Sequence, residues 1–191
     1  MKKTYRFPKN YLLFLALIIS SIGFCQSTAT YNITFTNFWN ESDHGPLPNG
    51  AHWSKLVGAI HNNNVSFLNI NEIASLGIEN IAEEGNDTVF KNNEVEPNSN
   101  AEKYIDGSGL VLSLGNTIEI NGIQINENFH FLTLVSMIAP SPDWMTFLNG
   151  LNLRDVNGWK PLIIIDLFPY DAGTENGNDY LMSNAATVPQ G

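Results

Sequence analysis

The amino-acid sequence predicts an all-β fold, an antiparallel β-sandwich with one or two short helices. Several segments alternate apolar with polar residues, which is the two-residue period of a strand with one buried face. Polar stretches rich in turn-forming residues separate these segments, and only two stretches show helical spacing. Many strands joined by short turns are typical of two packed antiparallel sheets.

The first 25 residues have the pattern of a signal peptide. MKKTYRFPKN is basic, YLLFLALIIS is apolar, and SIGFCQ ends in small residues. The apolar core is shorter than the roughly 20 residues that a membrane-spanning helix needs. We therefore expect a secreted domain at 26–191, cleaved before Gln26. Lipid attachment to Cys25, the one cysteine of the chain, is the alternative, and the bulky Phe24 disfavours it.

The chain beyond residue 25 is strongly acidic. It carries 5 basic and 19 acidic residues, a formal charge of −14, against −10 for the whole sequence. Such a surface repels nucleic acid and anionic membranes, whose binding needs clustered Lys and Arg. We expect no nucleic-acid partner and no membrane insertion, and we expect divalent cations and basic partners to fit better.

The first half of the domain combines one clear strand with the helical stretches. YNITFTNFW, at 31–39, alternates as a strand does, and a polar loop follows it. In AHWSKLVGAIHN the apolar residues recur every three or four positions, which predicts a short helix near 52–62. NEIASLGIENIAEEG predicts a second helix at 71–84, interrupted by Gly77 and closed by Gly85. Residues 86–109 are polar, and we expect a surface excursion there.

The second half is dominated by predicted strands. TIEINGIQI places Asn121-Gly122 symmetrically between two pairs of isoleucines, so a two-residue turn there puts all four isoleucines on one face. FHFLTLVSMI, MTFLNGLNL and PLIIIDLF follow as strands. The last is apolar on consecutive positions, which predicts a central strand covered on both faces.

Two acidic loops are the candidate site. Asp143, in PSPDW, and Asp171, in PYDAGT, each follow a predicted strand and a proline. Loops at the same end of a sandwich meet in space, and two carboxylates brought together favour a hard cation with oxygen ligands, such as calcium. Backbone carbonyls of 172–174, the Thr174 hydroxyl and the nearby Glu175 could complete the ligand shell.

A longer pattern resembles a known family. YNITFTNFW, AHWSKLVGAIHN, ASLGIENIAEEG, APSPDWMTFLNGLNL, Trp159, LFPYDAGTENG and ATVPQ occur in this order over roughly residues 30–190. Together they resemble the spondin N-terminal domain of F-spondin and mindin, here as a bacterial-type secreted member. SPDW followed about 25 residues later by PYDAGT is the most specific part of the likeness.

The resemblance implies a C2-like sandwich, an adhesive role at the cell surface or in the extracellular matrix, and a calcium ion at one end of the sandwich. It assigns metal ligation to Asp143 and Asp171. A third, acidic ligand is implied on the strand before SPDW, where ungapped counting reaches Gln124 and the nearest acids are Glu119 and Glu127. An amide at Gln124 in place of a carboxylate implies weaker calcium binding.

Alternative functions rest on fewer residues. A calcium-supported, carbohydrate-binding module could use the four tryptophans as a sugar platform, although we expect at least three of them to be packing residues. A glycosidase could use Asp143 and Asp171 as paired carboxylates, but no sequence motif marks catalysis, so we expect no enzyme. His52 and His61 are nine residues apart, which fits structural histidines better than a zinc pair. The expected partner is an extracellular protein or glycan.

Overall fold

The computed structural model describes residues 27–112 and 115–190, so the predicted signal peptide and Cys25 lie outside the described residues. No helix in these two ranges is long and apolar enough to cross a membrane. The strands are β1 (Thr28–Thr36), β2 (His52–Trp53), β3 (Val57–His61), β4 (Ala101–Asp106), β5 (Leu110–Val111), β6 (Thr117–Asn126), β7 (Phe131–Ala139), β8 (Trp144–Asn152), β9 (Arg154–Asp155), β10 (Gly158–Trp159) and β11 (Pro169–Asp171). The helices are α2 (Glu41–His44), α3 (Leu76–Glu84) and the π-helical η1 (Phe90–Val95).

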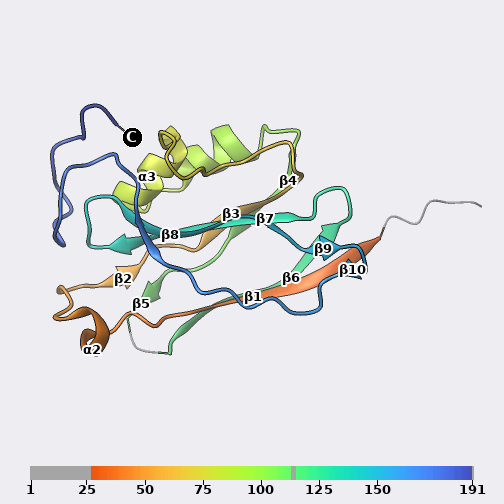
Figure 1. The fold of residues 1–191 in the computed structure, drawn as a ribbon, viewed down its shortest axis with the longest axis horizontal. Helices are drawn as coiled ribbons and strands as arrows, with labels where there is room; N and C mark the ends of the chain where they lie inside the picture. The colour runs from red at the N-terminus through yellow and green to blue at the C-terminus, as the bar shows by residue number, and fades with distance from the viewer. Residues whose placement is uncertain (1–26, 113–114, 191) are drawn as a thin grey trace, which may run out of the picture.

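Two antiparallel sheets form the sandwich, as the sequence predicts. In the larger sheet β7 pairs with β8 along one edge and with β3 and β2 along the other, while β11, β4 and β5 extend it outward. The smaller sheet is β1 with β6. Figure 1 shows three layers, with α3 on the outer face of the larger sheet and β1 and β6 below its inner face. The prediction of a mostly β fold with few short helices is confirmed.

β6 is one continuous strand, so the predicted hairpin turn is wrong. Tyr31 pairs with Ile123 and Ile33 with Ile120, which leaves Asn121 and Gly122 opposite a single residue of β1. This is a β-bulge, and Gly122 has a φ of 71°. The extra residue turns the strand by half a period, so all four isoleucines still face the core, as expected.

The helix expected near 52–62 is instead β2 and β3. All five residues of β3 are buried, because the strand lies between β4 and β7 and has both faces covered. A side chain at Gly58 would overlap the backbone carbonyl of Thr133 on β7, so the close approach of these strands requires glycine. A short strand buried on both faces has no alternation, and its apolar spacing resembled that of a helix.

The second predicted helix is present as α3, which begins at Leu76 and not at 71. Ser75 caps it, since its side chain accepts a hydrogen bond from the Ile78 amide, and Gly85 ends it in the left-handed conformation. Gly77 does not interrupt the helix but lies inside it. Its amide donates to the carboxylate of Glu94, which follows on η1.

The segment expected to be a polar excursion is largely structured. Phe90 and Val95 of η1 are buried in the same core cluster as α3, and β4 pairs along the whole of β3. Two buried apolar residues at the ends of η1 thus anchor a helix whose other residues are polar.

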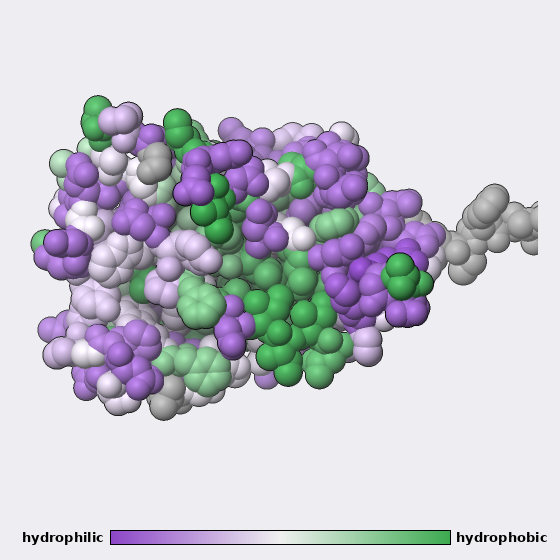
Figure 2. Space-filling view, viewed as in Figure 1, coloured by the Kyte–Doolittle hydropathy of each residue, from purple (hydrophilic) through white to green (hydrophobic). Residues whose placement is uncertain are grey.

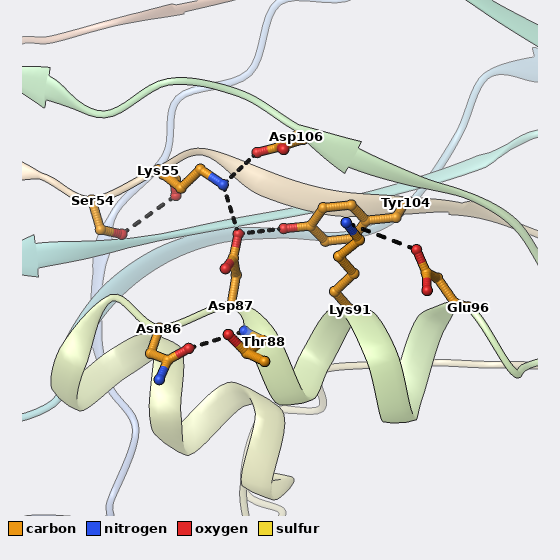
Figure 3. Close-up of polar contacts among 9 residues, drawn as sticks. All are labelled: Ser54, Lys55, Asn86, Asp87, Thr88, Lys91, Glu96, Tyr104 and Asp106. Carbon is orange, nitrogen blue, oxygen red and sulfur yellow. Dashed lines mark hydrogen bonds and ion pairs between the residues drawn. The ribbon is translucent and has the colours of Figure 1, made fainter.

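A polar network anchors the α3–η1 connection to the sheet. Asp87 accepts hydrogen bonds from Lys55 Nζ at 3.0 Å and from the Tyr104 hydroxyl at 2.7 Å, and Lys55 also pairs with Asp106 at 2.6 Å (Figure 3). Burial opposes ionisation of Asp87, but these hydrogen bonds outweigh it and lower the pKa of its carboxyl. The network therefore helps to hold α3, and the acids that it carries, over the larger sheet.

The segment 161–168 differs most from expectation. PLIIIDLF was predicted as a central strand, but only β11, which begins at Pro169, pairs with the sheet. Leu162 is 75% exposed and Ile164 is 83% exposed. An unbroken apolar run predicts burial, but here only Ile163 packs against a core cluster and most of the other side chains are exposed.

Candidate functional site

The two predicted acids meet at one end of the larger sheet. Asp143 ends the turn between β7 and β8, and Asp171 ends β11. Because β11 pairs with the start of β8, Asp171 lies directly opposite Trp144, the residue after Asp143. Ala172 also donates its amide to the Asp143 carbonyl at 3.1 Å. Strand pairing thus brings together two loops that are 28 positions apart.

Asp143 is fully buried and organises the loop that follows β11. Its Oδ2 accepts hydrogen bonds from the Thr174 amide at 2.7 Å, the Glu175 amide at 3.0 Å and the Thr174 hydroxyl at 3.3 Å. Its relative exposure is 0%. Three donors thus converge on one oxygen of a side chain that has no contact with solvent.

Two carboxylate oxygens at this site are buried without a hydrogen-bond partner: Oδ1 of Asp143 and Oε2 of Glu175. A buried carboxylate oxygen that lacks a donor costs free energy because it has lost its water. The loop amides of Thr174 and Glu175 hold the carboxylate of Asp143 in place, so its free oxygen does not turn toward solvent. This arrangement fits the coordination preferences of a hard cation such as calcium.

Helix α3 adds two more acids from above the sheet. Burial has the largest effect on Glu83 and raises the pKa of its carboxyl, while a hydrogen bond with Thr174 lowers it in part. The remaining increase comes from the negative charges of Glu175, Glu79 and Asp143. Repulsion among these carboxylates is a second sign of a site that favours positive charge.

Asp171 reaches the surface beside these buried acids. Its side chain is exposed, and Oδ1 accepts the Gly173 amide at 2.8 Å, which fixes the turn in which Gly173 has a φ of 73°. One carboxylate oxygen of Asp171 therefore remains available at the rim of the site. Among residues 27–112 and 115–190, no three His, Cys, Asp or Glu side chains already converge as a metal cluster.

Gln124 lies elsewhere. It is exposed on β6 opposite Thr30, and β6 pairs with β1 in the smaller sheet. Glu119 is opposite Thr34 on the same strand, and Glu127 binds Arg154 Nη1 at 2.9 Å. The structure thus places none of the three positions considered for a third ligand in the cluster of Asp143. Counting along the sequence does not show which sheet a strand joins, and β6 pairs with β1 instead of with the strands beside Asp143 and Asp171.

The acids of α3 were missed by sequence reasoning. Glu79 and Glu83 are four positions apart, so they share one face of the helix. That spacing was visible in the sequence, but glutamates on a helix surface are common, and only the docking of α3 onto β7 and β8 directs them toward the loop.

The structure gives little support to the two alternative functions, a glycosidase and a carbohydrate-binding module. A glycosidase carboxylate must touch its substrate, and Asp143 is buried under the loop of Thr174. Trp39 and Trp53 are each only 8% exposed, while Trp144 and Trp159 are partly buried against core clusters. The expectation that at least three tryptophans serve packing is confirmed.

The histidines are structural, as expected. His61 is buried, with Nδ1 2.7 Å from the Asn62 carbonyl and Nε2 2.9 Å from the Thr133 hydroxyl. His52 Nδ1 lies 2.7 Å from the Gly50 carbonyl. Each of these two rings therefore lies against a neighbouring backbone carbonyl, as a structural histidine does.

Comparison with known proteins identifies the family. The family model of the spondin N-terminal domain, Spondin_N, matches residues 29–191. The chain belongs to this family. The spondin domain is a non-catalytic module, which agrees with the expectation that this protein is not an enzyme.

Its relatives include two kinds of spondin. Human Spondin-2 is 30% identical over 176 residues, which cover 89% of this chain and 53% of Spondin-2. Rat Spondin-2 is 29% identical over 175 residues, and chicken Spondin-1 is 29% identical over 171 residues, or 85% of this chain and 21% of Spondin-1. The chain therefore spans about half the length of Spondin-2 and about a fifth of Spondin-1.

Proposed function

We propose that this spondin domain is a secreted binding module, which uses a calcium ion to rigidify the acidic end of its sandwich and binds an extracellular protein there. The observation that carries the cation site is the pair of buried, unpartnered carboxylate oxygens on Asp143 and Glu175. The basic and apolar N-terminal 25 residues support secretion.

The residues that would hold calcium are Asp143, Asp171 and Glu175. Asp143 and Glu175 supply the buried oxygens, and Asp171 supplies a carboxylate at the rim. Bound calcium would offset the repulsion among these acids and the carboxylates of α3. The protein's own part is to fix the loop: the amides of Thr174 and Glu175 hold one oxygen of Asp143, which leaves the other turned away from them.

A cation in this position would serve binding by ordering loops. The loops after β7 and β11 are joined by Asp143, so a ligand bound between the two acids restrains both. A loop that is ordered before its partner arrives loses less entropy on binding. We therefore propose an extracellular protein as the partner, in agreement with the adhesive role that the family resemblance implies, and keep a glycan as the alternative.

Calcium titration by calorimetry on residues 26–191 tests the site. We expect binding by the wild type and at least a tenfold loss in Asp171→Asn and Glu175→Gln. Gln124→Ala and Glu119→Gln are matched controls on the other sheet, and they should bind as the wild type does. Unchanged affinity in Asp171→Asn and Glu175→Gln, or a loss confined to Gln124→Ala, would contradict this assignment.

The partner class needs a separate measurement. Immobilised matrix glycoproteins and a glycan array, each probed with and without chelator, distinguish a protein ligand from a sugar. We expect chelator-sensitive binding to protein that survives enzymatic removal of its glycans. Binding that follows the glycans would support the carbohydrate-binding alternative instead.

A further inference from the structure

The open side of the sandwich carries a groove with a volume of about 820 Å³. One wall is formed by the second half of β1 and Phe38, which follows that strand, and the other is the segment 162–169. Apolar and aromatic side chains line the space between the walls, among them Phe35, Trp53, Ile138 and Trp144. Asp143, Asp171 and Glu175 do not line this groove, although Asp143 directly precedes Trp144 in the sequence.

The segment that forms one wall is mostly apolar, and most of its side chains are exposed. Leu162, Ile164 and Phe168 are 75%, 83% and 64% exposed, and Phe38 on the opposite wall is 69% exposed. Figure 2 shows a continuous apolar area in the middle of this face, where the segment crosses in front of β1 in Figure 1. A contiguous apolar patch on a protein surface usually marks an interaction site.

The backbone of the same segment is unpaired. In the described chain no backbone hydrogen bond involves residues 161–167, and the next residue, Phe168, accepts one bond from the Thr146 hydroxyl at 3.1 Å. β1 pairs with β6 and with no other described strand, so its second edge is also open. Both walls therefore offer unpaired amides and carbonyls beside apolar side chains.

These features together indicate which kind of ligand the groove fits. A small apolar molecule would cover the side chains but leave both rows of backbone groups unsatisfied. A strand satisfies them, because its amides and carbonyls point to both of its edges while alternate side chains enter the apolar space. The charged or titratable side chains that line the groove are Asp166, His44 and Tyr180, without any Lys or Arg, so basic residues on the strand's outer face complement it.

We infer that this groove accepts a β-strand from a separate polypeptide, with alternating apolar side chains and basic residues on its solvent face, which pairs with the free edge of β1. Asp166 then meets the basic residues, and Phe38 and Ile164 close over the apolar ones. The inference does not rest on the calcium site, since none of the proposed metal ligands lines the groove.

The test uses a nine-residue synthetic peptide in which valine alternates with threonine and a lysine stands at each end. Its matched control carries the same side chains but is N-methylated on every second residue, which removes one row of amide donors. Fluorescence anisotropy with residues 26–191 should show at least tenfold weaker binding for the methylated peptide. Phe38→Asp and Ile164→Asp should each weaken the unmethylated peptide at least tenfold.

Val156→Asp is the control variant, because Val156 is 100% exposed and does not line the groove. It should bind the peptide as the wild type does, and circular dichroism of each variant checks its fold. In hydrogen exchange, the unmethylated peptide should protect amides of 162–167 and of β1. Calcium or a chelator should change neither result, so failure here is distinct from failure of the cation site.

Three outcomes would overturn the inference. Equal binding of both peptides would mean apolar adsorption without strand pairing. An absence of binding and of amide protection at millimolar peptide would mean that the groove accepts no free strand. Peptide-sensitive dimerisation in analytical ultracentrifugation would mean that a second copy of this chain is the occupant.

Discussion

The Thr174 amide donates to Asp143 Oδ2 at 2.7 Å and thereby joins two loops that are 31 residues apart in the sequence. Both side chains are buried, at 1% and 0% exposure. The Thr174 hydroxyl lies 3.3 Å from the same oxygen. Because the contact satisfies only one carboxylate oxygen, it holds Asp143 in place and leaves the other oxygen buried without a hydrogen-bond partner.

Thr174→Val should destabilise the protein by about 1–2 kcal/mol. The substitution keeps the shape of the side chain and the backbone amide, but it removes the hydroxyl that serves Asp143 and Glu83. Urea denaturation in chelator measures the loss. Thr88→Val, at an exposed position, is the control and should change stability by less than about 0.5 kcal/mol. Equal stability of Thr174→Val and the wild type would show that the hydroxyl is dispensable.

Glu83→Gln should stabilise the calcium-free protein at pH 7. The folded-state pKa of Glu83 is raised, so the folded state favours the protonated form and loses stability as the pH rises through that pKa. Removing the charge removes this loss, by less than about 1 kcal/mol because solvent screens a half-buried group. The gain should vanish near pH 4, and Glu84→Gln, which is exposed, should show no gain. A net destabilisation at pH 7 would contradict repulsion as the cause.

Asp87→Asn should lower the free energy of unfolding by about 1–2 kcal/mol at pH 7. The stability of the variant should also depend less on pH in the acidic range than that of the wild type. The pKa of Asp87 is lowered in the folded state, so its contribution is present above the unfolded pKa and is lost as the pH falls through the folded pKa. The comparison of wild type and variant from pH 7 to pH 2 measures this. Asp106→Asn removes the more exposed partner of Lys55 and should cost less than about 0.5 kcal/mol. Parallel curves for Asp87→Asn and wild type would refute the linkage.

The free energy of unfolding should decrease as the pH falls from 7 toward 5, and His61 should be a cause of this decrease. Burial lowers the pKa of its imidazole, against a smaller raising effect of the Asn62 carbonyl, so the unfolded state takes up the proton first. Protonation also removes the acceptor at Nε2 that lies 2.9 Å from the Thr133 hydroxyl. His61→Asn should be less stable at pH 7 but less sensitive to pH in this range. His52→Asn, at an exposed site, should keep the wild-type slope.

The sequence predicted best the strands that are long or have one buried face. β1 alternates as expected, while β7 is buried along nearly its whole length and β8 follows it, and both were predicted from apolar runs that end at turn residues. β3 was taken for a helix, because a short strand covered on both faces shows no two-residue period. The isoleucines of β6 were placed on the correct face for a different reason, since a bulge and a hairpin turn can produce the same pattern.

The sequence predicted only those residues of the candidate site that a local sequence pattern marks. Asp143 and Asp171 follow strands and prolines, and the structure sets them side by side through the pairing of β8 and β11. The role of Glu83 depends on how α3 docks, which no local pattern contains. The exposure of the segment 161–168 could not be predicted from the sequence either. An apolar run indicates burial, but it does not show which part of the protein would cover it.

The melting temperature of residues 26–191 as a function of calcium concentration tests the central claim most directly. A cation that binds only the folded state stabilises it in proportion to the logarithm of its concentration above the dissociation constant, by about 2.7 kcal/mol at a hundredfold excess. We expect a rising melting temperature for the wild type and for Gln124→Ala, and most of the rise should be absent in Asp143→Asn. A wild-type melting temperature that millimolar calcium leaves unchanged would contradict the account.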